Sequence, residues 1–420
     1  MLHSPPFCIP NDRSVISKEP FTASERRAVL SLAVLYNFRM LGLFMVLPLI
    51  GVYGLDLVGA TSALIGIALG AHGLTQVVLQ VPMGWASDRV GRKPVILLGL
   101  AIFVMGSFVA AMADTIFGVI VGRLMQGGGA ISAALLALAA DYTRNQQRTK
   151  AIAIIGASIG VSFVIALVLG PGIAALGGLS LVFAVTGLLG LIGMTLVVWV
   201  LPAEPGLATG RDPAETVRLK QIPHAVVAPG LPALYASVLF CHLVLMAAFV
   251  VIPARLAQVI GLPADHHWAV YLGAIVLSVP GVLWALRGGR KGNNTGQILL
   301  VALGALGIGA VLAVNGAGIG AVACGLIIFF TGFNVMEATL PSLASQIAPV
   351  ALRGTVMGIF SSAQFLGVFV GGSLGGILYG AGGLSALNVL FLLVLLLWLP
   401  LLWMWHRTSS FLVEAAQKQA

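Results

Sequence analysis

Long apolar segments separated by short polar connections fill most of this chain of 420 residues. Each segment is long enough to cross about 30 Å of hydrocarbon as a helix rising about 1.5 Å per residue. The pattern therefore predicts an all-α membrane protein with twelve transmembrane helices in two pseudo-symmetric six-helix bundles. The predicted helices cover residues 27–53, 63–83, 94–113, 116–140, 151–173, 179–201, 231–256, 268–286, 297–314, 318–341, 354–378 and 384–405.

Composition agrees with a surface that faces lipid. Hydrophobic residues make up 59% of the chain and charged residues only 8%, whereas water-soluble proteins carry about 25% charged residues. The 53 glycines suit helices that pack closely through small residues. A net charge of +9 would also suit nucleic acid or anionic lipid as a partner. The positions of the charges along the chain distinguish these partners from a role in membrane topology.

The positive charges mark one side of the membrane. All but three of the 22 Lys and Arg residues lie at the termini or in alternate connections, among them Arg89, Arg92 and Lys93. The connections of the other side, which include Asp56 and Asp114, carry no Lys or Arg. By the positive-inside rule, both termini are predicted to be cytoplasmic. This sorting accounts for the net charge without a nucleic-acid partner.

The chain is predicted to consist of two related halves. A constant offset places Gly177-Gly178 over Gly382-Gly383 and Gly170 over Gly375, which indicates a duplication. Repeated halves joined by a linker are typical of secondary transporters. The predicted regions are a cytoplasmic N-terminal segment (1–26), an N-terminal bundle (27–201), a cytoplasmic linker (202–230), a C-terminal bundle (231–405) and a cytoplasmic tail (406–420).

The N-terminal segment and the cysteines argue against a signal peptide, a disulfide framework and a zinc site. Residues 1–26 have no apolar core of a signal peptide, and Thr22 and Glu25 have the spacing of a capping box that starts the first helix. Cys8, Cys241 and Cys324 are far apart and form no CxxC pair, so neither a disulfide framework nor a zinc site is indicated. We expect no metal and no cofactor.

A charged run, Gly84-Trp-Ala-Ser-Asp-Arg-Val-Gly-Arg-Lys93, separates the second and third apolar segments. It is predicted to be a tight loop between two antiparallel helices. Asp88 would accept hydrogen bonds from a facing helix N-terminus or an arginine, and Arg89 or Arg92 would reach Asp141. A purely topological role for the charges would leave Asp88 and the glycines unexplained. The predicted cytoplasmic gate comprises Gly84, Asp88, Arg89, Gly91, Arg92, Lys93 and Asp141.

These motifs resemble those of the major facilitator superfamily. The charged run resembles that superfamily's loop 2–3 signature, and Gly122–Ala130 resembles its arginine-containing helix-4 motif. Gly170-Pro171 is similar to a helix-5 motif associated with antiporters, although Ala166 and Ala174 stand where glycines are usual. Residues 21–400 more closely resemble YajR-type bacterial transporters of the drug:proton antiporter branch. The runs that carry this likeness are Glu25–Arg27, Arg39–Gly42, Leu74–Gln76, Asn334–Ala338 and Ser362–Gly367.

The resemblance implies a multi-pass protein of the bacterial inner membrane that moves a small molecule, together with protons, by alternating access. A monomer without enzymatic activity is the default expectation. In that superfamily the aspartate equivalent to Asp88 holds the two halves together on the cytoplasmic side when the cavity opens outward. The best-known relative of this group carries an extra ferredoxin-like cytoplasmic domain at its C-terminus. This chain ends at Ala420, so regulation through such a domain is not expected.

The first, fourth, seventh and tenth predicted helices each carry one ionisable residue away from their ends, where a charge costs at least about 2.5 kcal/mol. These residues are Arg39, Arg123, His242 and Glu337, and the resemblance places all four on helices that line the central cavity. Glu337 is the one carboxylate deep in the apolar sequence, and desolvation would favour its neutral form, as a proton carrier requires. Asn334, one turn earlier, shares its face.

Each of these residues has an alternative interpretation. Glu337 is either the proton carrier or a paired structural carboxylate, and His242 is either a second protonatable group or a hydrogen-bonded core histidine. Arg123, with Gln126 on the same face, and Arg39 would bind an anion or tune a carboxylate. The polar stripe His72, Gln76 and Gln80 lines the path or joins helices. Gln364 and Asn37 are equally open.

Several other functions are excluded. No lysine follows a glycine as in a P-loop, no metalloprotease motif is present, and no repeated loop suggests a channel filter. Two hypotheses remain for the transported substrate. The first is proton-coupled export of amphipathic, drug-like molecules, and the second is uniport or symport of a small polar or anionic metabolite bound by the arginines. A sensor or scaffold without transport activity is a third.

Overall fold

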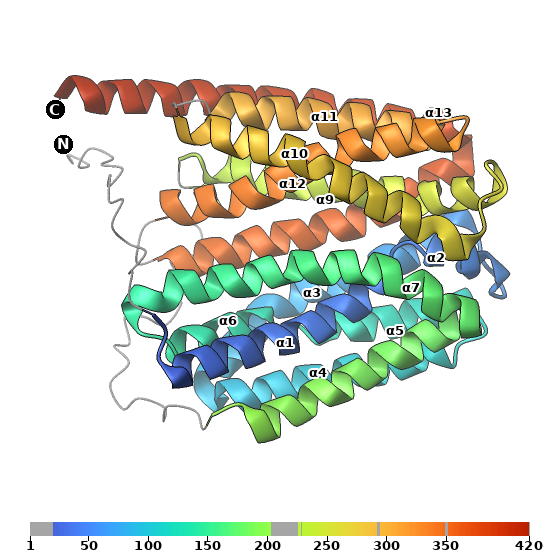
Figure 1. Cartoon of the computed structure of the whole chain (residues 1–420), viewed down its shortest axis with the longest axis horizontal. Helices are drawn as coiled ribbons and strands as arrows, with labels where there is room; N and C mark the ends of the chain where they lie inside the picture. The colour runs from blue at the N-terminus through green and yellow to red at the C-terminus, as the bar shows by residue number, and fades with distance from the viewer. Residues whose placement is uncertain (1–19, 203–225, 228, 292–294, 349–351, 420) are drawn as a thin grey trace.

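The computed structural model describes residues 20–202, 226–227, 229–291, 295–348 and 352–419. Most of the predicted N-terminal segment and most of the predicted linker lie outside these residues. The helices run side by side along the long axis of the molecule (Figure 1). They are α1 (Ala23–Met45), α2 (Ile50–Tyr53), η1 (Gly54–Asp56), α3 (Ser62–Val90), α4 (Arg92–Ala111), α5 (Ile116–Gly128), α6 (Ser132–Asp141), α7 (Asn145–Thr195), η2 (Leu196–Val200), α9 (Leu231–Gln258), η5 (Ala264–His266), α10 (His267–Lys291), α11 (Thr295–Asn315), α12 (Ile319–Ile347) and α13 (Arg353–Gln419).

Within the described residues, 10 helical stretches are long and apolar enough to cross a membrane. Two of them, at 146–200 and 354–406, each contain a glycine pair with non-helical backbone. Gly178 has φ 64° and Gly383 has φ 59°, a left-handed conformation that glycine adopts without steric cost. Each pair divides its stretch into two helices, so the described chain accounts for the twelve predicted spans.

The charged run is mostly helical, so the prediction of a loop over residues 84–93 is wrong. Helix α3 continues to Val90 and α4 begins at Arg92, which leaves Gly91 alone between them. Gly91 has φ 107°, and this left-handed backbone reverses the chain within one residue. The charges therefore occupy a helix end and the first turn of the next helix.

The helices of two predicted spans are interrupted along their length. The first breaks between α1 and α2, where Pro48 has no N–H to continue the helix. The fourth breaks at Gly129 between α5 and α6. A Cβ atom at Gly129 would meet the backbone oxygen of Gly99 in α4, and one at Gly127 would meet that of His72 in α3. The glycines therefore let three backbones approach closely.

The ends of the first and last helices give one confirmed prediction and one correction. Glu25 N–H donates to Thr22 Oγ1 at 3.2 Å and Thr22 N–H donates to Glu25 Oε2 at 2.8 Å, so the capping box is confirmed. At the other end of the chain α13 continues to Gln419. The last helix is therefore longer than the predicted end at residue 405.

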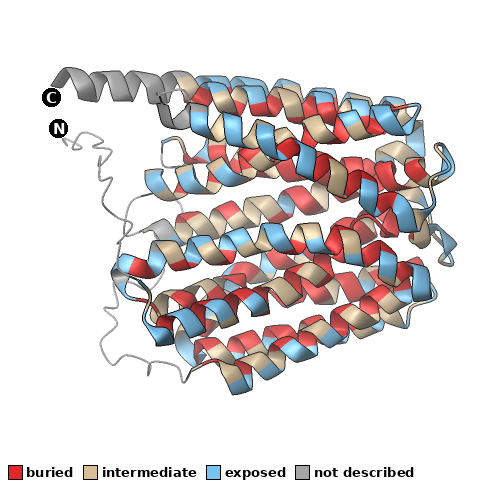
Figure 2. Cartoon of the chain, viewed as in Figure 1, coloured by how far each residue is buried: buried red, intermediate tan, exposed pale blue. Residues whose placement is uncertain are grey.

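We call residues 23–202 the N-terminal half and residues 229–419 the C-terminal half. Buried residues gather where the helices face one another, and exposed residues follow the outer faces (Figure 2). Large apolar residues such as Met112, Leu176 and Trp199 are more than half exposed, as expected of a surface that faces lipid. The halves meet where α3 packs against α13 and α2 packs against α9.

Candidate functional site

Arg39 of α1 is fully buried and belongs to a polar network in the N-terminal half. Its Nη2 donates to Gln76 Oε1 of α3 at 3.0 Å. Gln76 Nε2 and the hydroxyl of Tyr36 both donate to Ser132 Oγ of α6, at 3.5 Å and 2.8 Å. The guanidinium also lies 5.9 Å from the ring centre of Phe103. The network thus links α1, α3 and α6 around one buried cation.

Arg123 of α5 is equally buried and fastens α5 to α3. Its guanidinium donates to the backbone oxygens of Ala68 and Leu69 at 3.3 Å and 3.1 Å, and Nη2 lies 2.7 Å from His72 Nδ1. Nη1 donates to Gln126 Oε1 at 3.0 Å. Because a guanidinium only donates, His72 Nδ1 accepts this hydrogen bond. Arg123 and Gln126 share a face, and both act as helix-to-helix contacts.

The C-terminal half holds a second cluster, formed by His242, Glu337 and Gln364. His242 Nε2 of α9 lies 3.5 Å from Glu337 Oε2 of α12. Gln364 Nε2 of α13 lies 2.8 Å from His242 Nε2 and 3.3 Å from Glu337 Oε1. Three helices thus bring one protonatable pair and one amide together.

The hydrogen bonds define the tautomer of His242. Nδ1 lies 3.0 Å from the backbone oxygen of Val238. A carbonyl oxygen only accepts, so Nδ1 carries the hydrogen. In the neutral ring Nε2 is then the acceptor for the Gln364 amide. His242 is buried and its ring meets Phe333 edge-on at 5.6 Å.

Glu337 is more exposed than its place in the sequence predicts. Its side chain is 38% exposed, whereas that of His242 is 7% exposed. The carboxylate therefore has both a partner within the protein and a face open to a small molecule or to water. Asn334, which shares its helix, donates instead to Ser278 Oγ of α10 at 3.5 Å.

The gate residues have partners within the N-terminal half. Arg92 Nη1 lies 2.5 Å from Asp88 Oδ1, and Arg92 Nε lies 3.4 Å from Asp141 Oδ2. Arg89 stacks on Trp85 with its guanidinium carbon 3.9 Å from the ring centre. Lys93 donates to the backbone oxygen of Leu201 at 3.1 Å. Gly84 faces Ala133 of α6, and Gly91 forms the turn.

The helix-5 motif is a packing site. A Cβ atom at Gly170 would lie 3.0 Å from the backbone oxygen of Met45 in α1, and Pro171 follows within α7. At the repeat-related position, a Cβ atom at Gly375 would lie 2.7 Å from Ala247 Cα in α9. The same offset therefore relates both the glycines and the helices they touch.

The structure separates the four ionisable residues into two groups. Among the described contacts, Arg39 and Arg123 are each joined to α3, and His242 and Glu337 are joined to each other. Gln364 is the member that sequence reasoning left open, because nothing in its own helix signals a partner on α9 or α12. Gln76 and His72 were visible as a stripe, and their contacts join helices.

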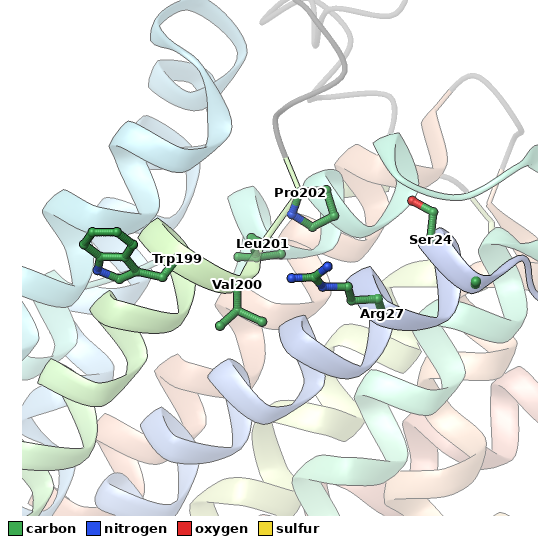
Figure 3. Close-up of a pocket in the computed structure, with 7 residues that line it drawn as sticks. Ser24, Arg27, Trp199, Val200, Leu201 and Pro202 are labelled. Atoms are coloured by element: carbon green, nitrogen blue, oxygen red, sulfur yellow. The ribbon is translucent and has the colours of Figure 1, made fainter.

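A hollow at one end of α1 lies away from both groups. It is lined by Ser24, Arg27, Trp199 and Leu201 among others, and Figure 3 shows the Arg27 guanidinium pointing toward Leu201 and Val200. All of its lining belongs to the N-terminal half, far along the chain from His242 and Glu337. In the described residues, no three His, Cys, Asp or Glu side chains gather as metal ligands.

Known proteins show which class of membrane protein has this two-part helical fold. The family model of the Major Facilitator Superfamily matches residues 32–372, and the chain belongs to this superfamily of transporters. It is a multi-pass, non-enzymatic protein of the inner membrane, similar to YajR.

Individual relatives add detail. The inner membrane transport protein YajR of Escherichia coli is 43% identical over 361 residues, which cover 86% of this chain and 79% of that protein. The multidrug resistance protein MdtH of Baumannia cicadellinicola is 25% identical over 351 residues, which cover 82% of each chain. The solved structure of a bacterial homologue of the lysosomal transporter Spinster matches with a TM-score of 0.71 at 14% identity, covering 93% of this chain and 98% of the other.

Proposed function

We propose that the protein is a proton-coupled exporter of amphipathic small molecules that works by alternating access, with Glu337 as the proton carrier. The observation that carries this is the contact between Glu337 and His242 across α12 and α9. A carboxylate that is partly exposed and also paired with an imidazole can take up a proton from one compartment and release it to another. Differential affinity for the proton then biases one conformation.

Three further observations support the sidedness of the protein, its substrate class and the antiport mode. The charge pattern of the connections supports a cytoplasmic gate and cytoplasmic termini. The YajR-like sequence and the more distant likeness to a multidrug resistance protein support a drug-like substrate. The Gly170–Pro171 element supports antiport, and the alanines around it leave that motif incomplete.

The alternative, uniport or symport of an anionic metabolite, needs Arg39 and Arg123 as ligands. Both side chains are fully or almost fully buried, and they donate to Gln76, Gln126 and backbone oxygens of α3, while Arg39 Nε has no partner among the described residues. Freeing either guanidinium would break contacts that hold the N-terminal half together. Export of amphipathic molecules is therefore the function that the geometry supports best.

A proteoliposome assay tests the proposal. A pH-sensitive dye in the lumen is followed while amphipathic cations and small carboxylates are added outside. Antiport raises the luminal pH and symport lowers it. Glu337→Gln is expected to abolish the signal, whereas Asp265→Asn, which alters an exposed carboxylate paired with His266, is expected to leave it unchanged. An undiminished signal in Glu337→Gln would refute the proton-carrier role.

A further inference from the structure

Gln364 lies on α13, the helix of the C-terminal half that packs against α3 of the N-terminal half. Its amide nitrogen contacts His242 and Glu337, both within the C-terminal half. The next residue, Phe365, and the turn of helix that follows it pack closely against α3 of the N-terminal half. A Cβ atom at Gly73 of α3 would lie 3.2 Å from the Phe369 nitrogen, and one at Gly70 would lie 2.9 Å from Phe369 Cα.

Helix α13 touches both halves through its backbone. Gly371 and Gly375 face α9, where a Cβ atom at Gly375 would lie 2.7 Å from Ala247 Cα. Gly372 faces α3, where its Cβ atom would lie 2.6 Å from the backbone oxygen of Gly66. Close-packed backbones shift together instead of deforming. A displacement of α13 relative to α9 is therefore transmitted to α3.

The hydrogen bonds of Gln364 depend on how many protons the pair holds. One NH₂ group supplies two hydrogens, which match the bare Nε2 of His242 and Oε1 of Glu337. A proton added to His242 must go to Nε2, because Nδ1 already donates to Val238. The protonated Nε2–H of His242 and the NH₂ group of Gln364 are then two donors that face each other, and Nε2–H donates instead to Glu337 Oε2, 3.5 Å away. Gln364 must therefore rotate its amide or move away from His242.

A proton added to Glu337 has a similar effect. Protonation converts one carboxyl oxygen into a donor, which is satisfied by His242 Nε2 or by the carbonyl oxygen of Gln364. Either choice breaks one of the two hydrogen bonds that the Gln364 amide now donates. Each protonation step thus changes the force on α13 at this position.

We propose that Gln364 is the positioning residue through which protonation of the His242–Glu337 pair moves α13 and thereby the N-terminal half. This inference rests on the proposed proton coupling and names the group that transmits it. The titratable groups that face Gln364 are His242 of α9 and Glu337 of α12. Cys241 of α9 is buried beside His242. On α3, which packs against the other side of α13, the titratable His72 is bonded to Arg123.

The test separates proton binding from movement. Spin labels at Gln146→Cys and Gln346→Cys, which are exposed positions at the gate end of each half, report the distance between the halves. Cys8→Ser and Cys324→Ser provide the background, and buried Cys241 is retained. The distance distribution is recorded from about pH 5 to about pH 8, where histidine ordinarily titrates. Protonation of Glu337 is followed separately by the infrared band of its carboxylic acid, which is identified by its loss in Glu337→Gln.

The wild type is expected to change its ratio of conformations by about fivefold or more over this range, and Gln364→Leu by less than about twofold, while the carboxylic acid band still titrates. Asn388→Leu is the matched control, because it removes another amide of α13 that is bonded to Asn315. It should behave like the wild type.

A full response in Gln364→Leu would overturn the inference and leave the proton site standing. Loss of the titrating band in Gln364→Leu would also overturn it, since Gln364 would then be part of the proton site. A full response in Glu337→Gln would refute the proposed function itself.

Discussion

Gly66 of α3 and Gly372 of α13 touch each other across the two halves of the molecule. A Cβ atom on Gly66 would meet the backbone oxygen of Gly372, and a Cβ atom on Gly372 would lie 2.6 Å from the backbone oxygen of Gly66. Gly376 repeats the contact one turn further, against Ser62. These contacts lie at the beginning of α3, whereas the gate residues lie at its end. The halves are therefore held together at the end opposite the gate, as in a transporter that is open to the gate side.

A larger side chain in this contact should favour the opposite conformation. In Gly70→Leu, the new side chain would clash with the backbone of Val368 and Phe369, and such overpacking costs about 1–3 kcal/mol. The ratio of conformations should then shift about 5- to 150-fold away from this state. The spin-label pair at Gln146→Cys and Gln346→Cys measures the shift as a shorter distance at the gate end. Gly304→Leu is the control, because a Cβ atom at Gly304 has no neighbour within 4 Å. Equal distances in both variants would contradict this role of the contact.

Asp88 should stabilise the conformation in which the gate end is closed, which is not the conformation of this structure. Asp88 is bonded to Arg92 of its own half here, so Asp88→Asn should leave the present conformation folded. If Asp88 holds the halves together when the gate end closes, losing its charged hydrogen bonds removes about 1.5–3 kcal/mol from that state alone. Transport should fall, and the spin-label distances should move further toward the open gate. Asp114→Asn, at the opposite end of the helices, is the control. Unchanged transport and distances in Asp88→Asn would reduce the motif to a topological signal.

The ion pair between Glu25 and Arg144 should contribute measurably to stability. Arg144 Nε and Nη2 lie 3.0 Å and 3.2 Å from the two oxygens of Glu25, whose side chain is 6% exposed. The same carboxylate accepts the backbone N–H of Arg144 at 3.0 Å. Because Arg144 is 44% exposed, solvent screens part of the interaction, and Glu25→Gln should lower the unfolding free energy by about 1–2 kcal/mol.

Thermal unfolding in detergent measures this effect as a lower midpoint. The pair of Asp265 and His266 is a suitable comparison, since its side chains are 49% and 64% exposed. Exposed pairs contribute little, so Asp265→Asn should unfold at nearly the wild-type temperature. A Glu25→Gln protein as stable as the wild type would mean that the capping box alone anchors α1.

Much of the candidate site was predictable one helix at a time. Arg39, Arg123, His242 and Glu337 stand out because an ionisable side chain in an apolar segment is costly and therefore needs a reason. The partners of these residues were less visible. Gln364 and Gln76 are neutral, and neutral amides occur in helices for many reasons. Their importance depends on a neighbour that lies on another helix and far away in the sequence.

The sequence by itself determined that this chain is a two-part helical membrane protein. It also located the twelve spans, the glycine pairs that divide α7 and α13, and the start of α1, because hydropathy, backbone freedom and capping act within a few residues of one another. Only the tertiary structure decided that the charged run is a helix end with a one-residue turn at Gly91. It also separated the two arginines from Glu337 and put Gln364 between Glu337 and His242. These features depend on which faces of helices far apart in the sequence pack against each other, and that packing is a property of the whole fold and not of any one segment.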